Sequence, residues 1–340
     1  MLLSRVAERV YWQARYLERA ENTARLVSVF SALLMDLPPG TKLGWESLIQ
    51  ITGNEKNFSE RFKLAKERQV IRYLLAERNG ISIIEMLAAA RENARTTREI
   101  LPAEAFELIN ELYFRTRDKA DAGVDRGKRY EFLADIVTEC QQFWGLMAGT
   151  MIRDSAYSFV RMGRSLERAD MTTRIVDAGS SNLLPDLEIE VDDPESREPY
   201  ENILWMNILL SQSAYQMYRQ HVREPVKAEE VVRFLLQSEE FPRATSHNLT
   251  TVTKVLEKLP NSSRVKWQTD KVRRLVREAD INALLNHGLL HFYPHLFLSR
   301  SAGDVENLLR RGLLQYLDNV QKEIAKVHLR IAETWFQHNT

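Results

Sequence analysis

Cysteine pairs, long apolar runs and an excess of either charge are all missing from this sequence of 340 residues. The single cysteine, Cys140, excludes an intramolecular disulfide and any zinc site built from several cysteines. No run approaches the ~20 apolar residues that a membrane-spanning helix requires. Arg5, Glu8 and Arg9 stand where a secretory signal would need an apolar stretch. The sequence therefore predicts a cytoplasmic protein with no membrane partner.

The balance of charge argues against another class of partner. Lysine and arginine together number 47, as do aspartate and glutamate, so the formal net charge is zero. Such a surface has no broad positive field to attract nucleic acid. A local basic run at 271–277 is interpreted as a solvated helix face. We therefore expect no nucleic-acid partner.

Motifs for nucleotide binding and nucleophilic catalysis are also missing. There is no P-loop, no G-x-G-x-x-G after a strand, no G-x-S-x-G elbow and no H-E-x-x-H. No recognised glycine-rich loop is present to hold ATP, so a catalytic role would need a partner that supplies this chemistry. His287, His291 and His295 are spaced so that two of them could ligate a metal from one helix face. Gly288 and Pro294 disfavour a regular helix there, and we interpret these histidines as partly buried core residues.

Glycine and proline are scarce, at 13 and 10 residues, and they gather where helices should end. The stretch 37–40 should close a first helix, and Pro102 suits the first turn of another. The polar stretch 117–130 predicts a loop, and the acidic stretch 188–200 predicts a linker. Elsewhere a 3.6-residue apolar period dominates, which predicts an all-α, multi-helix bundle of about ten to thirteen helices.

One polar motif occurs twice in the chain. The segment RYLERAENTAR (15–25) returns as RSLERADMTTR (164–174), with Glu18 and Glu167 149 residues apart. Later matches keep the same order along the chain: Trp45 with Trp205, 70–77 with 231–238, and 132–139 with 316–323. These matches predict a tandem duplication of a helical unit of ~150 residues.

The duplication sets the expected domain organisation. The first helical repeat should span 1–152 and the second 153–340, with insertions in the second near 185–200 and 280–305. Two related units would pack as one body with pseudo-two-fold symmetry and bring equivalent helices together near the axis.

A helical wheel of the first copy places its acids beside the apolar face. The apolar arc consists of Val6, Val10, Leu17, Ala20, Ala24 and Val27. Glu21 falls about 40° from Leu17, at the margin of this arc. The second copy repeats the arrangement with Asp170 in place of Glu21 and Val160 in place of Tyr11. Carboxylates near a core must be paired, bound to a metal or protonated, because an unpaired buried charge costs several kcal/mol.

These residues form the candidate site, and three interpretations of it stay open. The candidates are Arg15, Glu18, Arg19, Glu21, Arg25, Arg164, Glu167, Arg168, Asp170 and Arg174. They could form an arginine–carboxylate network that fixes the register of two helices. The arginines could instead bind the carboxylate or phosphate of a ligand in bidentate fashion.

The third interpretation is a metal site. Glu18, Glu21, Glu167 and Asp170 would supply four oxygen ligands suited to Mg²⁺ or Mn²⁺. Di-iron bundles use Glu-x-x-His on two helices, and neither copy contains a histidine. The many arginines also compete for the acids, so we favour no metal and predict no cofactor.

Four segments carry a resemblance to a known family: the opening LSRVAERVYWQARYLERAENTARLV, then 91–101, 161–177 and 233–249. At these motifs the sequence resembles the bacterial alpha-E family of helical proteins, over most of its length. The resemblance implies an association with ATP-grasp amide ligases, and often with transglutaminase-like proteases, in forming or processing peptide-like amide bonds. It also implies site roles for the candidate residues of both copies, and for Asn93, Arg95, Arg98, Pro242 and Arg243.

Our leading hypothesis is a helical accessory subunit of an ATP-grasp-type ligase that binds no ATP itself. It would offer a site lined by glutamate and arginine to an amino acid or peptide. The alternatives are a metal-dependent enzyme with bridging carboxylates and a structural scaffold with an ion-pair core. The sequence leaves open whether the chain forms a homo-oligomer.

Overall fold

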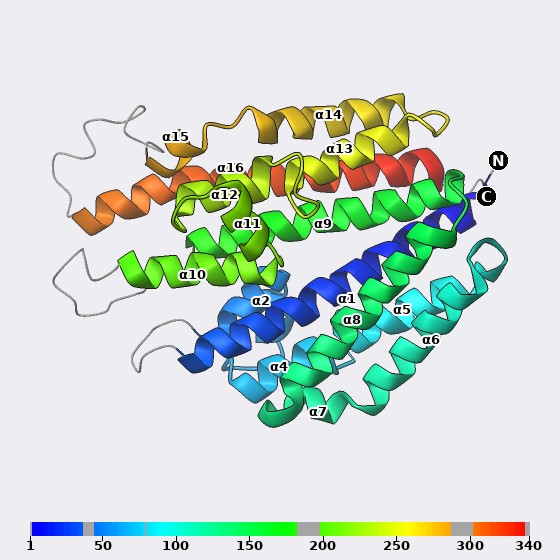
Figure 1. The fold of residues 1–340 in the computed structure, drawn as a ribbon, viewed down its shortest axis with the longest axis horizontal. Helices are drawn as coiled ribbons and strands as arrows, with labels where there is room; N and C mark the ends of the chain where they lie inside the picture. Colours follow the sequence, from blue (N-terminus) through cyan, green and yellow to red (C-terminus); the bar gives the residue numbers. More distant parts are fainter. Residues whose placement is uncertain (1, 37–43, 79, 182–197, 287–301, 337–340) are drawn as a thin grey trace.

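The computed structural model describes residues 2–36, 44–78, 80–181, 198–286 and 302–336. Within these ranges the chain forms sixteen α-helices and no strand, which confirms the predicted all-α fold (Figure 1). The prediction of ten to thirteen helices was too low. Several helices are only five to nine residues long, too short to display a 3.6-residue period.

The helices of the first half are α1 (Ser4–Asp36), α2 (Glu46–Thr52), α3 (Glu55–Ser59), α4 (Glu67–Leu75), α5 (Ile83–Arg95), α6 (Ala103–Asp118), α7 (Ala120–Val124) and α8 (Arg126–Thr150). Those of the second half are α9 (Ser155–Ser181), α10 (Glu198–Ser211), α11 (Tyr215–His221), α12 (Ala228–Gln237), α13 (Thr245–Leu256), α14 (Ser263–Arg277), α15 (Ile281–Asn286) and α16 (Ala302–Ile331). A short π-helical turn, η4 (Ala332–Phe336), follows α16. In the described part of the chain, no helix is both long and apolar enough to cross a membrane.

Helices α1 and α9 form the centre of the molecule. They pack against each other and run in the same direction, from right to left in the view of Figure 1. α1 extends for 33 residues because neither glycine nor proline interrupts it. α5, α8 and α10 also pack on α1, while α13, α16 and α2 pack on α9. Both central helices are therefore covered on several sides.

A glycine allows the two central helices to approach closely. A Cβ atom at Gly163 of α9 would lie 2.4 Å from the carbonyl oxygen of Tyr11 on α1. Such a contact is far shorter than van der Waals separation, so any other residue would force the helices apart.

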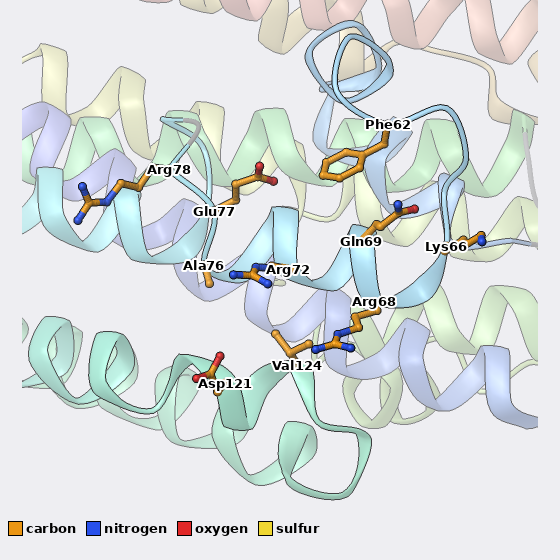
Figure 2. A pocket seen from close by; sticks show the side chains of 10 residues that line it. All are labelled: Phe62, Lys66, Arg68, Gln69, Arg72, Ala76, Glu77, Arg78, Asp121 and Val124. Atoms are coloured by element: carbon orange, nitrogen blue, oxygen red, sulfur yellow. The ribbon is translucent and has the colours of Figure 1, made fainter.

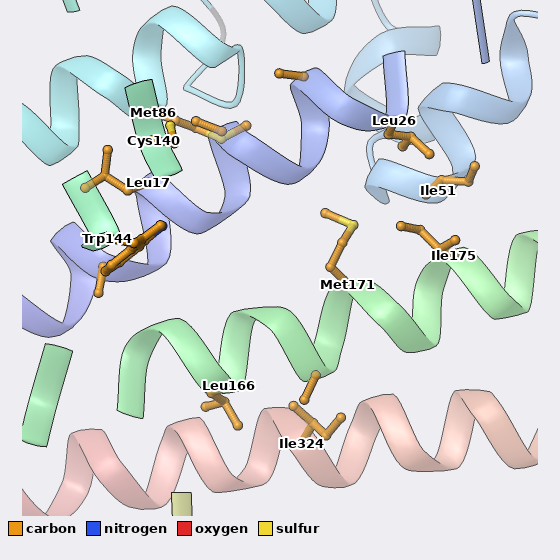
Figure 3. Packing of buried hydrophobic residues seen from close by; sticks show 14 of the residues in the cluster. Leu17, Leu26, Ile51, Met86, Cys140, Trp144, Leu166, Met171, Ile175 and Ile324 are labelled. Carbon is orange, nitrogen blue, oxygen red and sulfur yellow. The ribbon is translucent and has the colours of Figure 1, made fainter. Parts of the chain in front are cut away.

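The apolar core is continuous around this pair (Figure 3). Leu17 on α1, Leu166 on α9 and Ile324 on α16 are buried in it. Cys140 on α8 is fully buried in this core. Burial raises the pKa of its thiol, with Glu21 and Glu18 adding to the effect, and this keeps the sulfur protonated.

The polar stretch 117–130 is mostly helical, so the prediction of a loop there was wrong. α6 continues to Asp118, and α7 and α8 are separated only by Asp125. Arg129 is buried and donates from Nε to the carbonyl oxygen of Gly123 over 3.1 Å. The Arg129 side chain therefore makes a tertiary contact and does not belong to a solvated turn.

Other predicted boundaries have mixed outcomes. α6 begins directly after Pro102, as the proline indicated. The stretch 37–40, most of the predicted linker and most of both insertions (182–197 and 287–301) lie outside the described residues, and so do His287, His291 and His295.

Candidate functional site

Glu18 of α1 is held by arginines from the other central helix. Arg168 donates to both of its carboxylate oxygens, at 2.7 Å from Nε and 3.0 Å from Nη2. Arg164 donates from Nε over 3.0 Å. This is the bidentate geometry in which guanidinium and carboxylate interact most strongly.

Glu167 of α9 has the reciprocal set of partners on α1. Arg19 donates to both carboxylate oxygens, at 2.5 Å from Nε and 3.0 Å from Nη2. Arg15 donates from Nε over 2.7 Å. The two copies of the motif are therefore brought together, and each glutamate binds the arginines of the opposite copy.

The second acid of each copy pairs with the arginine four residues later. Arg25 lies 2.5 Å from Glu21, and Arg174 lies 2.9 Å from Asp170. The two pairs differ in exposure. The Glu21 side chain is 1% exposed, whereas the side chains of Asp170 and Arg174 are 17% and 35% exposed.

Arg243, from the turn before α13, completes the cluster of charged side chains around Glu18 and Glu21. Its Nη2 lies 2.5 Å from Glu21, and its Nη1 donates to Asn22 over 2.6 Å and to Glu18 over 3.4 Å. Burial lowers the pKa of Arg243 to about 10, and the nearby Arg168 contributes to the decrease. The guanidinium still carries its charge at neutral pH.

The wheel placed these acids at the margin of the core, but Glu18 and Glu21 are 0% exposed and Glu167 is 1% exposed. The wheel assumed a helix with one solvent face, whereas α1 is packed on several sides. Burial alone would raise the pKa of Glu167, but Arg19 and Arg15 lower it to about 2. Against the same effect of burial, Arg168, Arg164 and Arg243 hold the pKa of Glu18 well below its usual range. Both carboxylates are therefore ionised at neutral pH.

A histidine that the sequence did not bring forward joins this network. The Tyr11 hydroxyl accepts from Arg15 over 3.2 Å and lies 2.9 Å from Nδ1 of His328 on α16. Burial, with a smaller contribution from the charge of Arg15, lowers the pKa of His328 to about 4. The ring is therefore neutral at pH 7, and its Nδ1 can accept a hydrogen bond from the Tyr11 hydroxyl. No motif in the sequence connects these two positions.

A charged cavity of about 230 Å³ opens beside Glu167. It is lined by Arg19, Thr23, Thr52, Gly53, Asn54, Leu74, Ile81, Met86, Glu167, Asp170, Met171 and Arg174. We call this cavity the Asp170 pocket. Thr23 is buried, and its hydroxyl has no hydrogen-bond partner among the described residues. Gly53 has a left-handed backbone (φ 68°), and a Cβ there would lie 2.7 Å from the Arg174 guanidinium.

A larger groove of about 740 Å³ lies between α4 and α7 (Figure 2). Its cations, Lys66, Arg68, Arg72 and Arg78, are all exposed. Sequence reasoning did not select them. None of these four cations belongs to the network of ion pairs between α1 and α9. The Asp170 pocket, by contrast, is lined by four of the predicted site residues, Arg19, Glu167, Asp170 and Arg174.

The metal interpretation fits this geometry poorly. In the described ranges, no group of three or more His, Cys, Asp or Glu side chains is arranged to hold a metal ion. Each of the four proposed carboxylate ligands faces at least one arginine. The guanidinium groups compete with a cation for these carboxylates, and they occupy both oxygens of Glu18 and of Glu167.

The further candidates from the resemblance separate into two groups. Arg243 lies in the network, and the carbonyl oxygen of Pro242 accepts from Arg168 over 3.5 Å. Arg95 instead pairs with Glu92 at the surface, and Arg98 lies over the ring of Phe106. Asn93 accepts from neighbouring threonines through its main-chain carbonyl. These three contacts do not involve the network.

The fold and site together define an all-α protein with a buried arginine–glutamate network and a charged pocket at its edge. The Alpha-E family model, described as "A predicted alpha-helical domain with a conserved ER motif", matches residues 2–336. The chain therefore belongs to the Alpha-E family. Two of its Glu-Arg dipeptides, Glu18-Arg19 and Glu167-Arg168, lie at the centre of the network. No curated protein and no solved structure matches the chain.

Proposed function

We propose that this protein is an accessory subunit of an ATP-grasp-type amide ligase and binds an amino acid or peptide in the Asp170 pocket. The observation that carries the proposal is the pocket itself, which places Asp170 and Arg174 at a cavity with an unpartnered buried hydroxyl, that of Thr23. A carboxylate and a guanidinium at one opening suit a ligand with both charges.

The size of the pocket limits its occupant. Its volume of about 230 Å³ corresponds to roughly seven or eight waters at the density of the liquid. Pockets for drug-sized molecules are larger, typically ~300–1,000 Å³. The pocket therefore suits a single amino acid or one side chain of a peptide better than a nucleotide, and the ligase would supply the ATP chemistry. The partner is inferred from the family resemblance, which also implies a transglutaminase-like protease in the same system.

We further propose that the chain arose by tandem duplication, with repeats at 1–152 and 153–340 related by a pseudo-two-fold axis. The packing of helices supports this: α1 packs on α5 and α8, while α9 packs on α13 and α16. α2 packs on α9, and α10 packs on α1. The turns after α2 and α10 also match, with a left-handed residue in each, Gly53 (φ 68°) and Ser213 (φ 50°).

Co-purification tests the proposed partnership. The tagged full chain, expressed with an ATP-grasp-type ligase from the same genome, should retain the ligase through size-exclusion chromatography and raise its turnover. Absence of a complex together with unchanged turnover would contradict the proposal.

The complete burial of Glu18 and Glu21 favours the scaffold alternative. On that alternative, Glu21→Gln alters the free energy of unfolding but leaves every product of the ligase system unchanged. On the scaffold alternative, a substitution in the Asp170 pocket likewise leaves the products unchanged. On our proposal, the same substitution lowers the amount of product that the ligase forms.

A further inference from the structure

The two clusters of ion pairs between α1 and α9 differ in the residue that a neighbouring helix contributes just before its first turn. Arg243 precedes the first residue of α13 by two positions and extends into the cluster around Glu18. Ile81 precedes the first residue of α5 by two positions and lines the Asp170 pocket. α5 packs on α1, and α13 packs on α9. The cavity therefore lies beside the start of α5, where the residue is Ile81. Beside the start of α13, the side chain of Arg243 fills the corresponding space.

The partners of Arg243 have counterparts in the pocket wall. Arg243 contacts Glu18, Glu21 and Asn22. The residues 149 positions later are Glu167, Asp170 and Met171, and all three line the Asp170 pocket. Two carboxylates therefore border the cavity in the arrangement that receives a guanidinium in the other cluster.

The threonines of the two copies also differ in their hydrogen bonding. Thr172 donates from Oγ1 to the carbonyl oxygen of Arg243 over 2.8 Å. Thr23, which holds the same place in the first copy of the motif, is buried and lines the pocket without a hydrogen-bond partner among the described residues. A buried hydroxyl without a partner destabilises the fold unless a ligand or water satisfies it.

We propose that the Asp170 pocket receives the guanidinium group of an arginine-containing amino acid or peptide, which takes the place that Arg243 fills in the other cluster. This inference rests on the proposed function, since it names the ligand of the same pocket. Asp170 accepts from Arg174 through Oδ2. Its Oδ1 makes no hydrogen bond within the described ranges and is the acceptor for the incoming guanidinium.

The two clusters differ in the number of guanidinium groups around their acids. Glu18 and Glu21 are surrounded by Arg25, Arg164, Arg168 and Arg243, so that cluster already holds four guanidinium groups for two acids. Glu167 and Asp170 have three, Arg15, Arg19 and Arg174. A bound guanidinium gives the second cluster the same composition as the first.

Calorimetric titration of the full chain with L-arginine amide tests the inference, with L-citrulline amide as the matched neutral ligand. Arginine amide should bind at least ~10-fold more tightly, a difference of about 1.4 kcal/mol. Asp170→Asn should weaken arginine amide binding at least ~10-fold and bring it near that of citrulline amide. Because Asp170 is partly exposed, this variant should fold.

Substitution of Ile81 provides the second arm. Ile81→Arg should place a tethered guanidinium in the pocket and abolish binding of arginine amide while raising Tm. Ile81→Met, of similar volume and without charge, should keep the binding. Equal binding of arginine amide to all four proteins would overturn the inference, and so would equal affinity for the two amides.

Acetate and N-acetylglycine separate this inference from the proposed function. If these anions bind in an Arg174-dependent manner and arginine amide does not, the pocket binds a ligand but the guanidinium assignment is wrong. If no probe binds and no ligase co-purifies, both proposals are wrong.

Discussion

At the scale of single residues, the main feature is that Glu18 and Glu167 each receive bidentate donation from the opposite helix. A buried carboxylate in this state stays ionised because the arginines replace the water that it lost. Removing one charge from such a pair is costly, since its partners remain buried without compensation.

We expect Glu167→Gln to lower the free energy of unfolding by roughly 3–5 kcal/mol, because Arg15 and Arg19 would face a neutral amide. Urea unfolding measures the change. Glu92→Gln is the matched control, because its pair with Arg95 is more than half exposed and solvent screens it, so the variant should unfold nearly as wild type does. Equal losses in the two variants would contradict the account.

The pKa shifts predict two acid windows. The pKa of Glu167 is lowered to about 2 from 4.5, so the unfolded chain binds its proton first and stability falls between these pH values. The pKa of His328 is lowered to about 4 from 6.5, which destabilises the fold in the same direction between pH 6.5 and 4. We expect free energies of unfolding measured from pH 7 to 2.5 to depend less on pH in the upper window for His328→Asn. In the lower window they should depend less on pH for Glu167→Gln. Unchanged slopes in either variant would show that the assigned residue does not titrate there.

At the scale of elements, the close parallel packing of α1 and α9 brings the two copies of the motif into register. Gly163 permits this approach, because its missing Cβ leaves room for the main chain of Tyr11. Substitution should therefore separate the helices and disturb the ion pairs beyond the local clash.

Gly163→Ala should destabilise the protein by about 1–3 kcal/mol through overpacking against a main-chain atom that cannot rotate away. Gly145→Ala on α8 is the control, since a Cβ there meets nothing within 4 Å. At this exposed helix position alanine should stabilise by ~0.5–1 kcal/mol. Thermal unfolding compares them, and a stabilising effect at both positions would contradict the proposed close approach.

The sequence predicted the helical class and the repeated motif well, for a physical reason. Long helices reveal their period, and a polar motif repeated beside apolar positions indicates that its charges need partners. Full burial was not predicted because it depends on the other helices that cover α1. The polar stretch 117–130 misled for a similar reason, since buried Arg129 contacts the main chain of Gly123.

The Asp170 pocket was the least predictable feature. It depends on Ile81, which lies in the turn before α5, where no periodic pattern applies. On the duplication that we propose, Arg243 in the turn before α13 is the counterpart of Ile81, and the packing of α5 on α1 and of α13 on α9 supports this.

At the scale of the whole molecule, a network of seven arginines and four acids holds the two halves of the chain together. One cluster is closed by the protein's own Arg243, and the other borders a cavity. We therefore assign stability to the buried ion pairs of both clusters, and ligand binding to the cluster that borders the cavity. A substitution at Ile81 or at the partly exposed Asp170 should then change function without unfolding the chain.

The proposal that the Asp170 pocket serves the ligase can be tested by measuring the turnover of the ATP-grasp ligase in the presence of the Ile81→Arg variant. The account predicts that this variant folds, joins the ligase and supports less turnover than wild type, while Ile81→Met supports wild-type turnover. Equal turnover with a folded Ile81→Arg protein, its pocket filled, would contradict the claim that the Asp170 pocket serves the ligase.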